Sequence, residues 1–428
     1  MDTIFALASA QGKAGVSVIR ISGPQAFAAG RLLCGTLPDP RSAAVRVLKD
    51  AEGHRIDAAL VLCFAEKASF TGEPVVELQV HGSVAVVRRV LDVLATVDGL
   101  RMADAGEFTR RAFDNGQMDL AQTEGLADLI DAETEAQRRQ ALRVLSGDLG
   151  QLVAGWRDDL VRAAALLEAT IDFADEEVPV DVSPEVFGLL DGVSDSLRRQ
   201  VAGVRISERI RSGFEVAIVG KPNVGKSSLL NVLAGRDAAI TSEIAGTTRD
   251  VIEVRMDLNG LPVTLLDTAG LRETEDKVEA IGVARARARA AEADLRVVLL
   301  APGDTPDIAL ESEDIIVGAK ADLFEVDGFS VSAISGVGID DLVDRISNVL
   351  IARSAGAGVA THLRHKRGME RALDGLRIAM DWVRNGPDGY DIAAEELRIA
   401  IRALESLLGR VDVEDLLDEI FARFCVGK

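Results

Sequence analysis

One nine-residue stretch constrains the fold of this chain more than any other: Gly220-Lys-Pro-Asn-Val-Gly-Lys-Ser-Ser228. It fits the phosphate-binding pattern G-x-x-x-x-G-K-[ST], whose glycines let backbone N–H groups converge on a phosphate. The β-branched run at residues 214–219 precedes it, and residues 228–234 follow with helical spacing. This strand, loop and helix context favours a nucleotide site over an ordinary glycine-rich turn.

Further residues downstream match this phosphate site. Lys226 would reach the β- and γ-phosphates, and Ser227 would place its hydroxyl on Mg²⁺. The loop Ile244-Ala-Gly-Thr-Thr-Arg-Asp250 is typical of a γ-phosphate sensor. The strand expected at residues 262–267 ends in Asp267, which can hold Mg²⁺ through water, and the Gly270 N–H can contact the γ-phosphate.

The identity of the base follows from Lys320-Ala-Asp322. The Asp322 carboxylate can accept two N–H bonds from a guanine edge, and adenine offers no such pair. We therefore predict a GTPase rather than an ATPase. The usual motif is N-K-x-D, and Ala319 replaces its Asn, which removes one base contact and one tether to the P-loop.

Leu271 stands where many regulatory GTPases carry the Gln that orients the attacking water. Leucine has no donor or acceptor, so another group must orient that water. The acidic residues that follow within nine positions are, on their own, a solvated loop. They are Glu273, Glu275, Asp276 and Glu279.

The 428 residues are enough for two to four domains. The net charge of −21 argues against broad, charge-driven binding of nucleic acid. A local patch such as Arg364-His-Lys-Arg367 is either solvated surface or a contact to RNA phosphates. The three cysteines lack C-x-x-C spacing, and neither a signal peptide nor a membrane span is apparent. We expect a cytoplasmic protein without disulfides or zinc.

The expected architecture is multidomain, with α/β and α parts. Strands at residues 3–8, 16–22, 59–66 and 75–81 and a helix at 84–95 predict a small N-terminal α+β domain. Apolar residues at helical spacing predict helices around 142–171, 189–209 and 397–408. Gly147, Gly150 and Gly155 are candidate interruptions of the first of them. Between these helices, the order β-loop-α-β-β-α-β-α-β-α predicts an inserted P-loop GTPase domain with a doubly wound sheet.

Two charged residues break the pattern of the N-terminal strands. Arg20 lies among apolar residues, and alternation places Glu77 opposite Val76 and Leu78. A solvated sheet face is the simpler explanation for both.

The chain as a whole resembles the MnmE (TrmE) family of tRNA-modification GTPases. Besides the P-loop, the shared segments are Val18-Ile-Arg-Ile-Ser-Gly23, Ser69-Phe-Thr-Gly-Glu73, Glu77-Leu-Gln-Val-His-Gly82, Gly106-Glu-Phe-Thr-Arg110, Asp119-Leu-Ala-Gln-Thr-Glu124, Gly246-Thr-Thr-Arg-Asp250, Asp267-Thr-Ala-Gly-Leu271 and Phe424-Cys-Val-Gly-Lys428. The resemblance implies a folate-binding, dimerising domain at 1–117, a helical bundle from two segments at 118–212 and 356–428, and a G domain at 213–355.

The resemblance also implies a function. Members of this family, with an FAD-containing partner enzyme, install an aminomethyl-type group (carboxymethylaminomethyl) on C5 of the tRNA wobble uridine. A tetrahydrofolate derivative, formyl or methylene, supplies the one-carbon unit. Their G domains pair across a homodimer, with potassium as activator, and the partner complex is a heterotetramer or larger.

The implied sites are as follows. GTP and Mg²⁺ would be bound by Asn223, Val224, Gly225, Lys226, Ser227, Ser228, Ser242, Glu243, Ile244, Ala245, Gly246, Thr247, Thr248, Asp267, Thr268, Ala269, Gly270, Lys320 and Asp322. Within this set, Ser227 and Thr248 would ligate Mg²⁺. Potassium would lie among Asn223, Ser242, Ile244 and Thr247. Folate would meet Arg20, Glu77, Gln117 and Lys428, although the family usually has Lys or Arg where Gln117 stands.

Two residues would have catalytic roles: Glu279 would position the hydrolytic water, and Cys425 would serve the modification, unless Cys425 is only a small packing residue. The competing hypothesis is a GTP-switched ribosome-assembly factor that binds ribosomal RNA. The folate-type motifs at both termini argue against that alternative.

Overall fold

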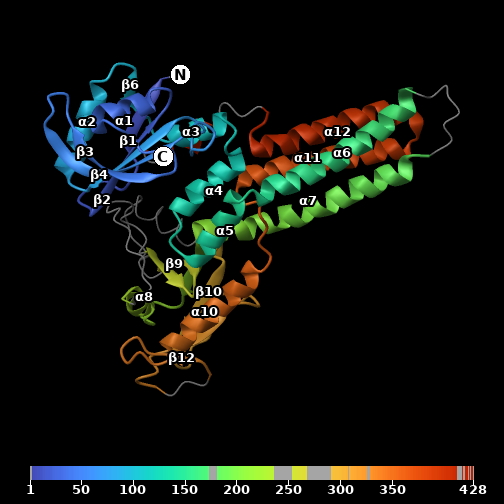
Figure 1. Ribbon diagram of the computed structural model, residues 1–428. Coiled ribbons are helices and arrows are strands. Elements are labelled where there is room, and N and C mark those ends of the chain that lie inside the picture. Colours follow the sequence, from blue (N-terminus) through green and yellow to red (C-terminus); the bar gives the residue numbers. More distant parts are fainter. Residues whose placement is uncertain are drawn as a thin grey trace, which may run out of the picture. The chain divides into compact units, whose positions relative to one another are not determined.

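The computed structural model describes residues 2–172, 181–235, 253–267, 291–306, 308–324 and 328–411, and residues 417, 420–422, 424, 426 and 427 near the C-terminus. The chain divides into two units (Figure 1). One comprises Met1–Ala127 and Glu405–Lys428, and the other is Asp128–Leu404. Within the described residues, no helix combines the length and apolarity that crossing a membrane requires.

The first unit is built on a six-stranded sheet with the order β3-β4-β5-β2-β1-β6. Its neighbouring strands are antiparallel except for β1 and β6. The strands are β1 (Thr3–Leu7), β2 (Val16–Ser22), β3 (Ala43–Lys49), β4 (Arg55–Phe64), β5 (Val75–His81) and β6 (Leu100–Met102). The helices of this unit are α1 (Ala26–Cys34), α2 (Val84–Ala95), α3 (Glu107–Asp114) and α4 (Leu120–Ile130), which ends just beyond it.

The α+β character expected of the N-terminal region is confirmed, with the predicted strands at 16–22 and 75–81 and the predicted helix at 84–95. The strand predicted at 59–66 begins four residues earlier, at Arg55, and ends at Phe64. No element was expected where α1, β3 and β6 lie. In β3 two apolar side chains face solvent instead of the core, since Val45 and Val47 are exposed.

The two faces of this sheet have different coverings. On one face, α1 and α2 bury a core that includes Ile19, Ile21 and Leu78. The opposite face carries Ile4 and Ala6 against Phe108 and Phe70, which come from α3 and from the loop before β5. Because side chains alternate along β2 and β5, Arg20 and Glu77 lie on this second face, directly paired across the two strands.

A charged cluster joins the N-terminus to α3. Arg111 donates hydrogen bonds to Asp2 Oδ1 at 2.7 Å, Glu107 Oε1 at 2.9 Å and Glu73 at 3.2 Å. Arg101 donates to Glu107 and Asp2 as well. Burial on its own would raise the pKa of Glu107, but hydrogen bonds, above all from Arg101, hold it below its ordinary value of 4.5. The Arg101 hydrogen bond is also the main cause of the lowered pKa of Asp2.

We expect acid to destabilise this unit through these carboxylates. Since their pKa values are lower in the folded state, their stabilising effect is complete above the ordinary value of 4.5 and is lost as the pH falls through the folded-state values. Calorimetric unfolding between pH 7 and pH 3 measures the loss. Glu107→Gln should lower the unfolding temperature at pH 7 and make it less sensitive to acid. An equally steep acid response in the variant would contradict this assignment.

The C-terminal residues pack inside the first unit, to which they belong. Leu417, Ile420, Phe421 and Phe424 form one cluster with Leu120 of α4, and Val426 bridges to Ala105. Gly427 has a φ of +101°, and a Cβ there would lie 2.0 Å from the Leu7 carbonyl oxygen. Only glycine fits this close approach.

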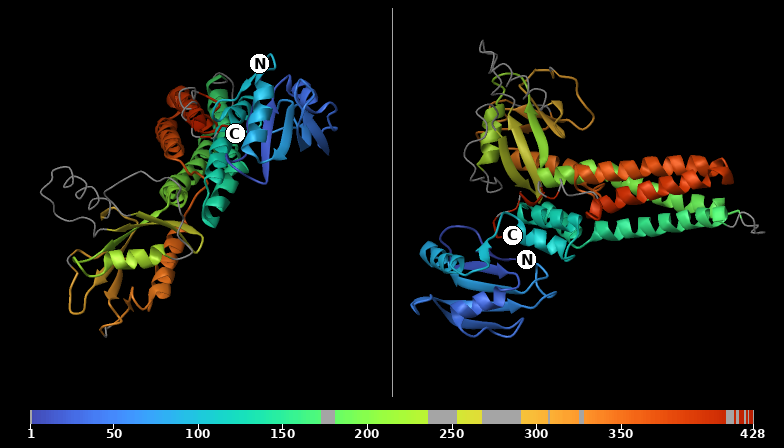
Figure 2. Two further views of the ribbon diagram at one scale, coloured as in Figure 1. Left: turned by 90° about the vertical axis from the view of Figure 1, so that its left-hand side faces the viewer. Right: turned by 90° about the horizontal axis from the view of Figure 1, so that it is seen from above.

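Long helices dominate the start and the end of the second unit. They are α5 (Glu135–Leu145), α6 (Asp148–Asp172), α7 (Ser183–Ser212), α11 (Leu363–Arg384) and α12 (Tyr390–Glu405), with a 3₁₀ turn at Pro387–Gly389. A second 3₁₀ turn, Ser406–Leu408, belongs to the first unit. Two chain segments therefore contribute helices that lie side by side, α6 and α7 from one and α11 and α12 from the other (Figure 2).

The predicted amphipathic stretch at 142–171 is two helices rather than one. Gly147, with a φ of +89°, separates α5 from α6, whereas Gly150 and Gly155 lie within α6. The helix predicted at 189–209 extends over Ser183–Ser212 and has Pro184 in its first turn, where proline costs no hydrogen bond.

A second six-stranded sheet lies between these helical segments in the sequence, with the order β12-β11-β10-β7-β9-β8. Its strands are β7 (Phe214–Val219), β8 (Glu253–Leu258), β9 (Leu261–Asp267), β10 (Leu295–Leu300), β11 (Ile315–Ala319) and β12 (Ser330–Val331). All neighbours are parallel except the β8–β9 hairpin. Two helices of this region are α8 (Lys226–Ala234) and α10 (Ile339–Ser354).

This order agrees with a doubly wound sheet, in which β7 has β9 on one side and β10 on the other. One expected element is wrong: residues 301–306 and 308–314, between β10 and β11, contain no helix. Pro302, Gly303 and Pro306 explain this, because they disfavour a helix in so short a segment. The strand predicted at 331–334 is only Ser330–Val331.

Candidate nucleotide-binding site

The P-loop connects the carboxyl end of β7 to the N-terminus of α8. Gly220 has a φ of +153°, and a Cβ at this position would lie 2.4 Å from the Leu299 carbonyl oxygen of β10. Gly225 and Asn223 also have positive φ angles, of +116° and +62°. Glycine is thus required at 220 by a close backbone approach, and the loop turns sharply enough to point N–H groups inward.

Lys226 lies inside this loop. Its Nζ donates hydrogen bonds to the carbonyl oxygens of Gly220, at 2.6 Å, and Lys221, at 2.9 Å. The residue is only 5% exposed. The Lys221 side chain, by contrast, pairs with Asp304 at 2.7 Å. An ammonium held at the N-terminus of a helix provides the charge that a polyphosphate requires.

A cavity of about 130 Å³ lies beside the P-loop at the carboxyl edge of the sheet. It brings together residues of the P-loop, of the ends of β10 and β11 and of the segment around β12. The lining residues are Val224, Gly225, Ser228, Leu229, Leu299, Ala319, Lys320, Asp322, Leu323, Val331, Ala333 and Ile334. The predicted base-recognition residues Lys320 and Asp322 therefore share one cavity with the predicted P-loop residues.

Ser332 holds the Asp322 carboxylate in place. The Ser332 Oγ donates to Asp322 Oδ1 at 2.6 Å and accepts the N–H groups of Ile334 and Ser335, at 3.2 and 3.1 Å. Ser332 is fully buried. Ser332 was not predicted as a site residue, because the sequence of this segment indicates only a strand.

A second group of predicted residues lies on the sheet of the first unit. Arg20 Nε donates to Glu77 Oε1 at 2.9 Å, and both side chains are less than one-fifth exposed. The guanidinium lies 5.3 Å from the ring centre of Phe70 and 5.6 Å from that of Phe108. A solvated sheet face would leave these charges more open to water. The two phenylalanines were not predicted as site residues, although they belong to motifs quoted above.

Gln117 lies close to the loop that carries Phe70. A Cβ at Gly72 would be 3.2 Å from Gln117 Nε2, and Asn115 Nδ2 donates to the Thr71 carbonyl oxygen at 2.7 Å. Gln117 therefore lies near the loop that carries Phe70, one of the two rings beside Arg20.

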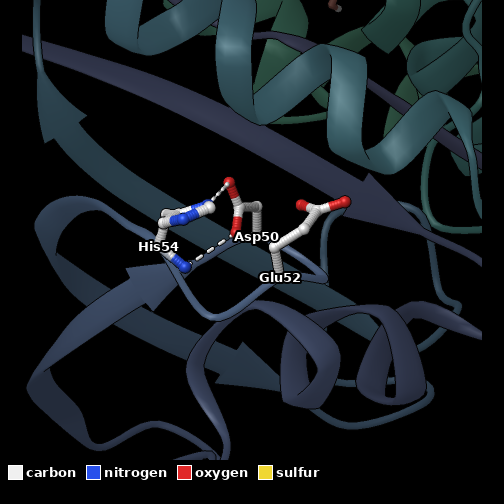
Figure 3. Close-up of side chains that lie close together, drawn as sticks. All are labelled: Asp50, Glu52 and His54. Atoms are coloured by element: carbon white, nitrogen blue, oxygen red, sulfur yellow. Dashed lines mark hydrogen bonds and ion pairs between the residues drawn. The ribbon is translucent and has the colours of Figure 1, made fainter.

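A third cluster, Asp50, Glu52 and His54, lies in the turn between β3 and β4 (Figure 3). Arg89 of α2 donates to Asp50 Oδ2 at 2.7 Å, and this bond is the main cause of the lowered pKa of Asp50. His54 N–H donates to Asp50 Oδ1 at 2.8 Å. Since the guanidinium already neutralises Asp50, the cluster ties this turn to α2.

Several predicted residues lie outside the described residues. They are Ser242, Glu243, Ile244, Ala245, Gly246, Thr247, Thr248, Thr268, Ala269, Gly270, Glu279, Cys425 and Lys428. Asp267 is the last residue of β9, and its backbone neighbour across the ladder is Ile218, two residues before the P-loop.

Comparison with known proteins gives consistent results over the whole chain. The family model "GTP-binding protein TrmE N-terminus" matches residues 3–117, and the model "MnmE helical domain" matches residues 120–425. Proteins of Roseobacter denitrificans and Ruegeria pomeroyi, each named tRNA modification GTPase MnmE, are 62% and 63% identical to this chain. Each comparison covers the full length of both chains.

These matches extend over all parts of the chain, including the P-loop and both termini. They confirm the resemblance inferred from the sequence motifs. The chain therefore belongs to the MnmE family of tRNA-modification GTPases.

Proposed function

We propose that this chain is a potassium-stimulated GTP hydrolase that acts in the modification of the tRNA wobble uridine. With an FAD-dependent partner enzyme, it would add an aminomethyl-type group to C5, using a tetrahydrofolate one-carbon donor. The observation that carries the hydrolase assignment is the placement of Lys226 and Asp322 along one edge of one sheet, at the P-loop and in the cavity beside it. The phosphates and the base of one nucleotide can meet these two groups together.

The catalytic ions would lie around the P-loop. Ser227 with Thr248 would hold Mg²⁺, and Asn223 with Ser242, Ile244 and Thr247 would hold potassium. A monovalent cation beside the bridging oxygens stabilises developing charge as an arginine finger does, which accounts for Leu271 in place of Gln. Glu279 would position the attacking water.

We expect GTP hydrolysis to be several-fold faster in potassium than in sodium at matched ionic strength. Asn223 has a positive φ in the P-loop and is exposed, so its side chain is available to an ion. Asn223→Ala should abolish the difference between the two salts while GTP still binds. Phosphate release measures both effects. Equal rates in the two salts for the unaltered chain would refute the potassium role.

The folate site would include Arg20, Glu77, Gln117 and Lys428. Glu77 suits the adjacent N–H donors of a pterin edge, and Arg20 offers a fixed guanidinium beside it. The partial burial of this ion pair beside Phe70 and Phe108 supports the assignment, because it holds both charged groups in one fixed position. Gln117 supplies a neutral group where the family usually has a cation, so folate affinity should be modest.

A reduced folate should bind to this chain, and this test separates the proposal from a ribosomal RNA-binding factor. Glu77→Gln should weaken binding of 5-formyltetrahydrofolate at least about tenfold, because a charge-assisted pair of bonds is lost. Glu52→Gln is the matched control, because Glu52 is exposed in the β3–β4 turn. Isothermal titration on the full chain measures the affinities. No folate binding by the unaltered chain would favour the alternative.

The remaining parts of the proposal concern partners. We propose a homodimer that joins the FAD-dependent enzyme in a heterotetramer or larger complex in the cytoplasm, and Cys425 would take part in the modification. Gly427 supports a role for the C-terminus, because its backbone closely approaches the Leu7 carbonyl oxygen of the first sheet. Reconstitution with the partner enzyme, tRNA, folate and GTP tests this part.

A further inference from the structure

The cavity beside the P-loop, which contains Asp322, offers few polar side chains. Among its described lining residues, only Asp322, Lys320 and Ser228 have polar side-chain atoms. The Asp322 carboxylate is fixed through its bond with Ser332. The other described side chains of the lining are aliphatic, Leu299 and Val331 among them. Among the described side chains, the carboxylate is therefore the main group that can distinguish one base from another.

Ala319 determines what the cavity cannot recognise. It is the last residue of β11, pairs with Val331 of β12 and is 3% exposed. Its methyl group packs with the apolar core of the sheet and also lines the cavity. A methyl group neither donates nor accepts a hydrogen bond, so this wall offers no partner to a ring nitrogen.

The connectivity of a guanine nucleotide then decides which base atoms are recognised. Guanine presents N1–H and N2–H₂ as donors on one edge, and its acceptor N7 lies on the imidazole ring. That ring also carries N9, through which the ribose and the phosphates are attached. With the phosphates at Lys226 and the donor edge on Asp322, the imidazole ring lies on the P-loop side of the cavity, which includes Val224 and Leu229.

We propose that the side chains of this cavity select guanine through N1–H and N2–H₂ at Asp322, and that N7 lies at Ala319, whose methyl group leaves it unrecognised. Nucleotides with an altered imidazole edge, such as 7-deazaguanosine triphosphate, are then ligands equivalent to GTP. Inosine triphosphate, which lacks the N2 amino group, is a poor ligand. The inference rests on the proposed function only in taking GTP as the ligand of this cavity.

The deciding experiment uses the unaltered full chain. GTP, 7-deaza-GTP and ITP compete with a fluorescent GDP labelled on its ribose, in the presence of Mg²⁺ and potassium. We expect 7-deaza-GTP to bind within about twofold of GTP and ITP to bind about tenfold more weakly, since one bond to a charged acceptor is lost. A loss of about fivefold or more for 7-deaza-GTP overturns the proposal.

Two variants make the test sharper. Ala319→Asn should restore a preference for GTP over 7-deaza-GTP of about fivefold, because a carboxamide can donate to N7. Ala319→Ser, a smaller change in this buried position, should restore a weaker preference in the same direction. Equal binding of both nucleotides by folded Ala319→Asn would show that N7 does not face this position, which also overturns the proposal.

Ser228→Ala is the control for the hydroxyl in the lining. If the unaltered chain discriminates against 7-deaza-GTP and this variant does not, Ser228 reads N7 and the proposal is wrong. A chain that binds none of the three nucleotides would instead refute the proposed function. The two failures are therefore distinguishable in one set of titrations.

Discussion

Replacing Lys226 with alanine should reduce GTP turnover at least about a hundredfold. Lys226 is 5% exposed and its ammonium bonds two carbonyl oxygens of the P-loop, so the charge is held inside the loop. In phosphoryl transfer, catalysis comes almost entirely from positioning and from stabilising charge on the transferred group. Alanine supplies neither. Phosphate release at saturating GTP and Mg²⁺ measures the loss.

Lys221→Ala is the matched control in the same loop. Its ammonium pairs with Asp304, and we expect turnover within about threefold of the unaltered chain, since a part-exposed ion pair contributes little. Ser227→Ala should be as severe as Lys226→Ala because Mg²⁺ loses a ligand. If Lys226→Ala turned over GTP at a near-normal rate, the P-loop assignment would be wrong. Equal damage from Lys221→Ala would mean that the loop, rather than the charge, had been disturbed.

Features encoded within one short stretch of sequence could be predicted well. The strand at Phe214–Val219, the loop and α8 follow one another directly in the sequence. Their local residue pattern was therefore enough to predict all three. The same holds for α2, with its apolar face. The position of helix breaks was less certain: Gly147 ends α5, while Gly155 lies in mid-helix. Packing decides whether a helix tolerates a glycine, and packing cannot be read locally.

Features that depend on distant contacts were missed. Phe70 and Phe108 acquire a role only because two separate segments lie over Arg20. Ser332 matters because its hydroxyl bonds Asp322, ten residues earlier. In strand β3, Val45 and Val47 are exposed, so these apolar side chains face away from the core. In each case the residue type alone is compatible with several roles, and only the fold selects one.

Asp322→Asn should exchange the preference for GTP for a preference for xanthosine triphosphate. The carboxylate of the unaltered chain can accept both N–H donors of guanine. In xanthine an acceptor oxygen replaces the N2 amino group, and an amide N–H₂ can donate to it. We expect GTP affinity to fall about tenfold or more, because a buried donor of the base loses its charged partner. A competition titration of GTP, ATP and XTP measures the exchange.

Ser332 makes this prediction specific, because it sets the direction of the new amide. Its hydroxyl oxygen accepts two backbone N–H groups, from Ile334 and Ser335, so its proton is directed toward residue 322. An asparagine there must turn its carbonyl oxygen toward Ser332, which leaves the N–H₂ group facing the base. Adding Ser332→Ala to Asp322→Asn removes this constraint and should weaken the XTP preference. If Asp322→Asn still favoured GTP, or if the unaltered chain bound ATP and GTP with equal affinity, Asp322 would not be the residue that recognises the base.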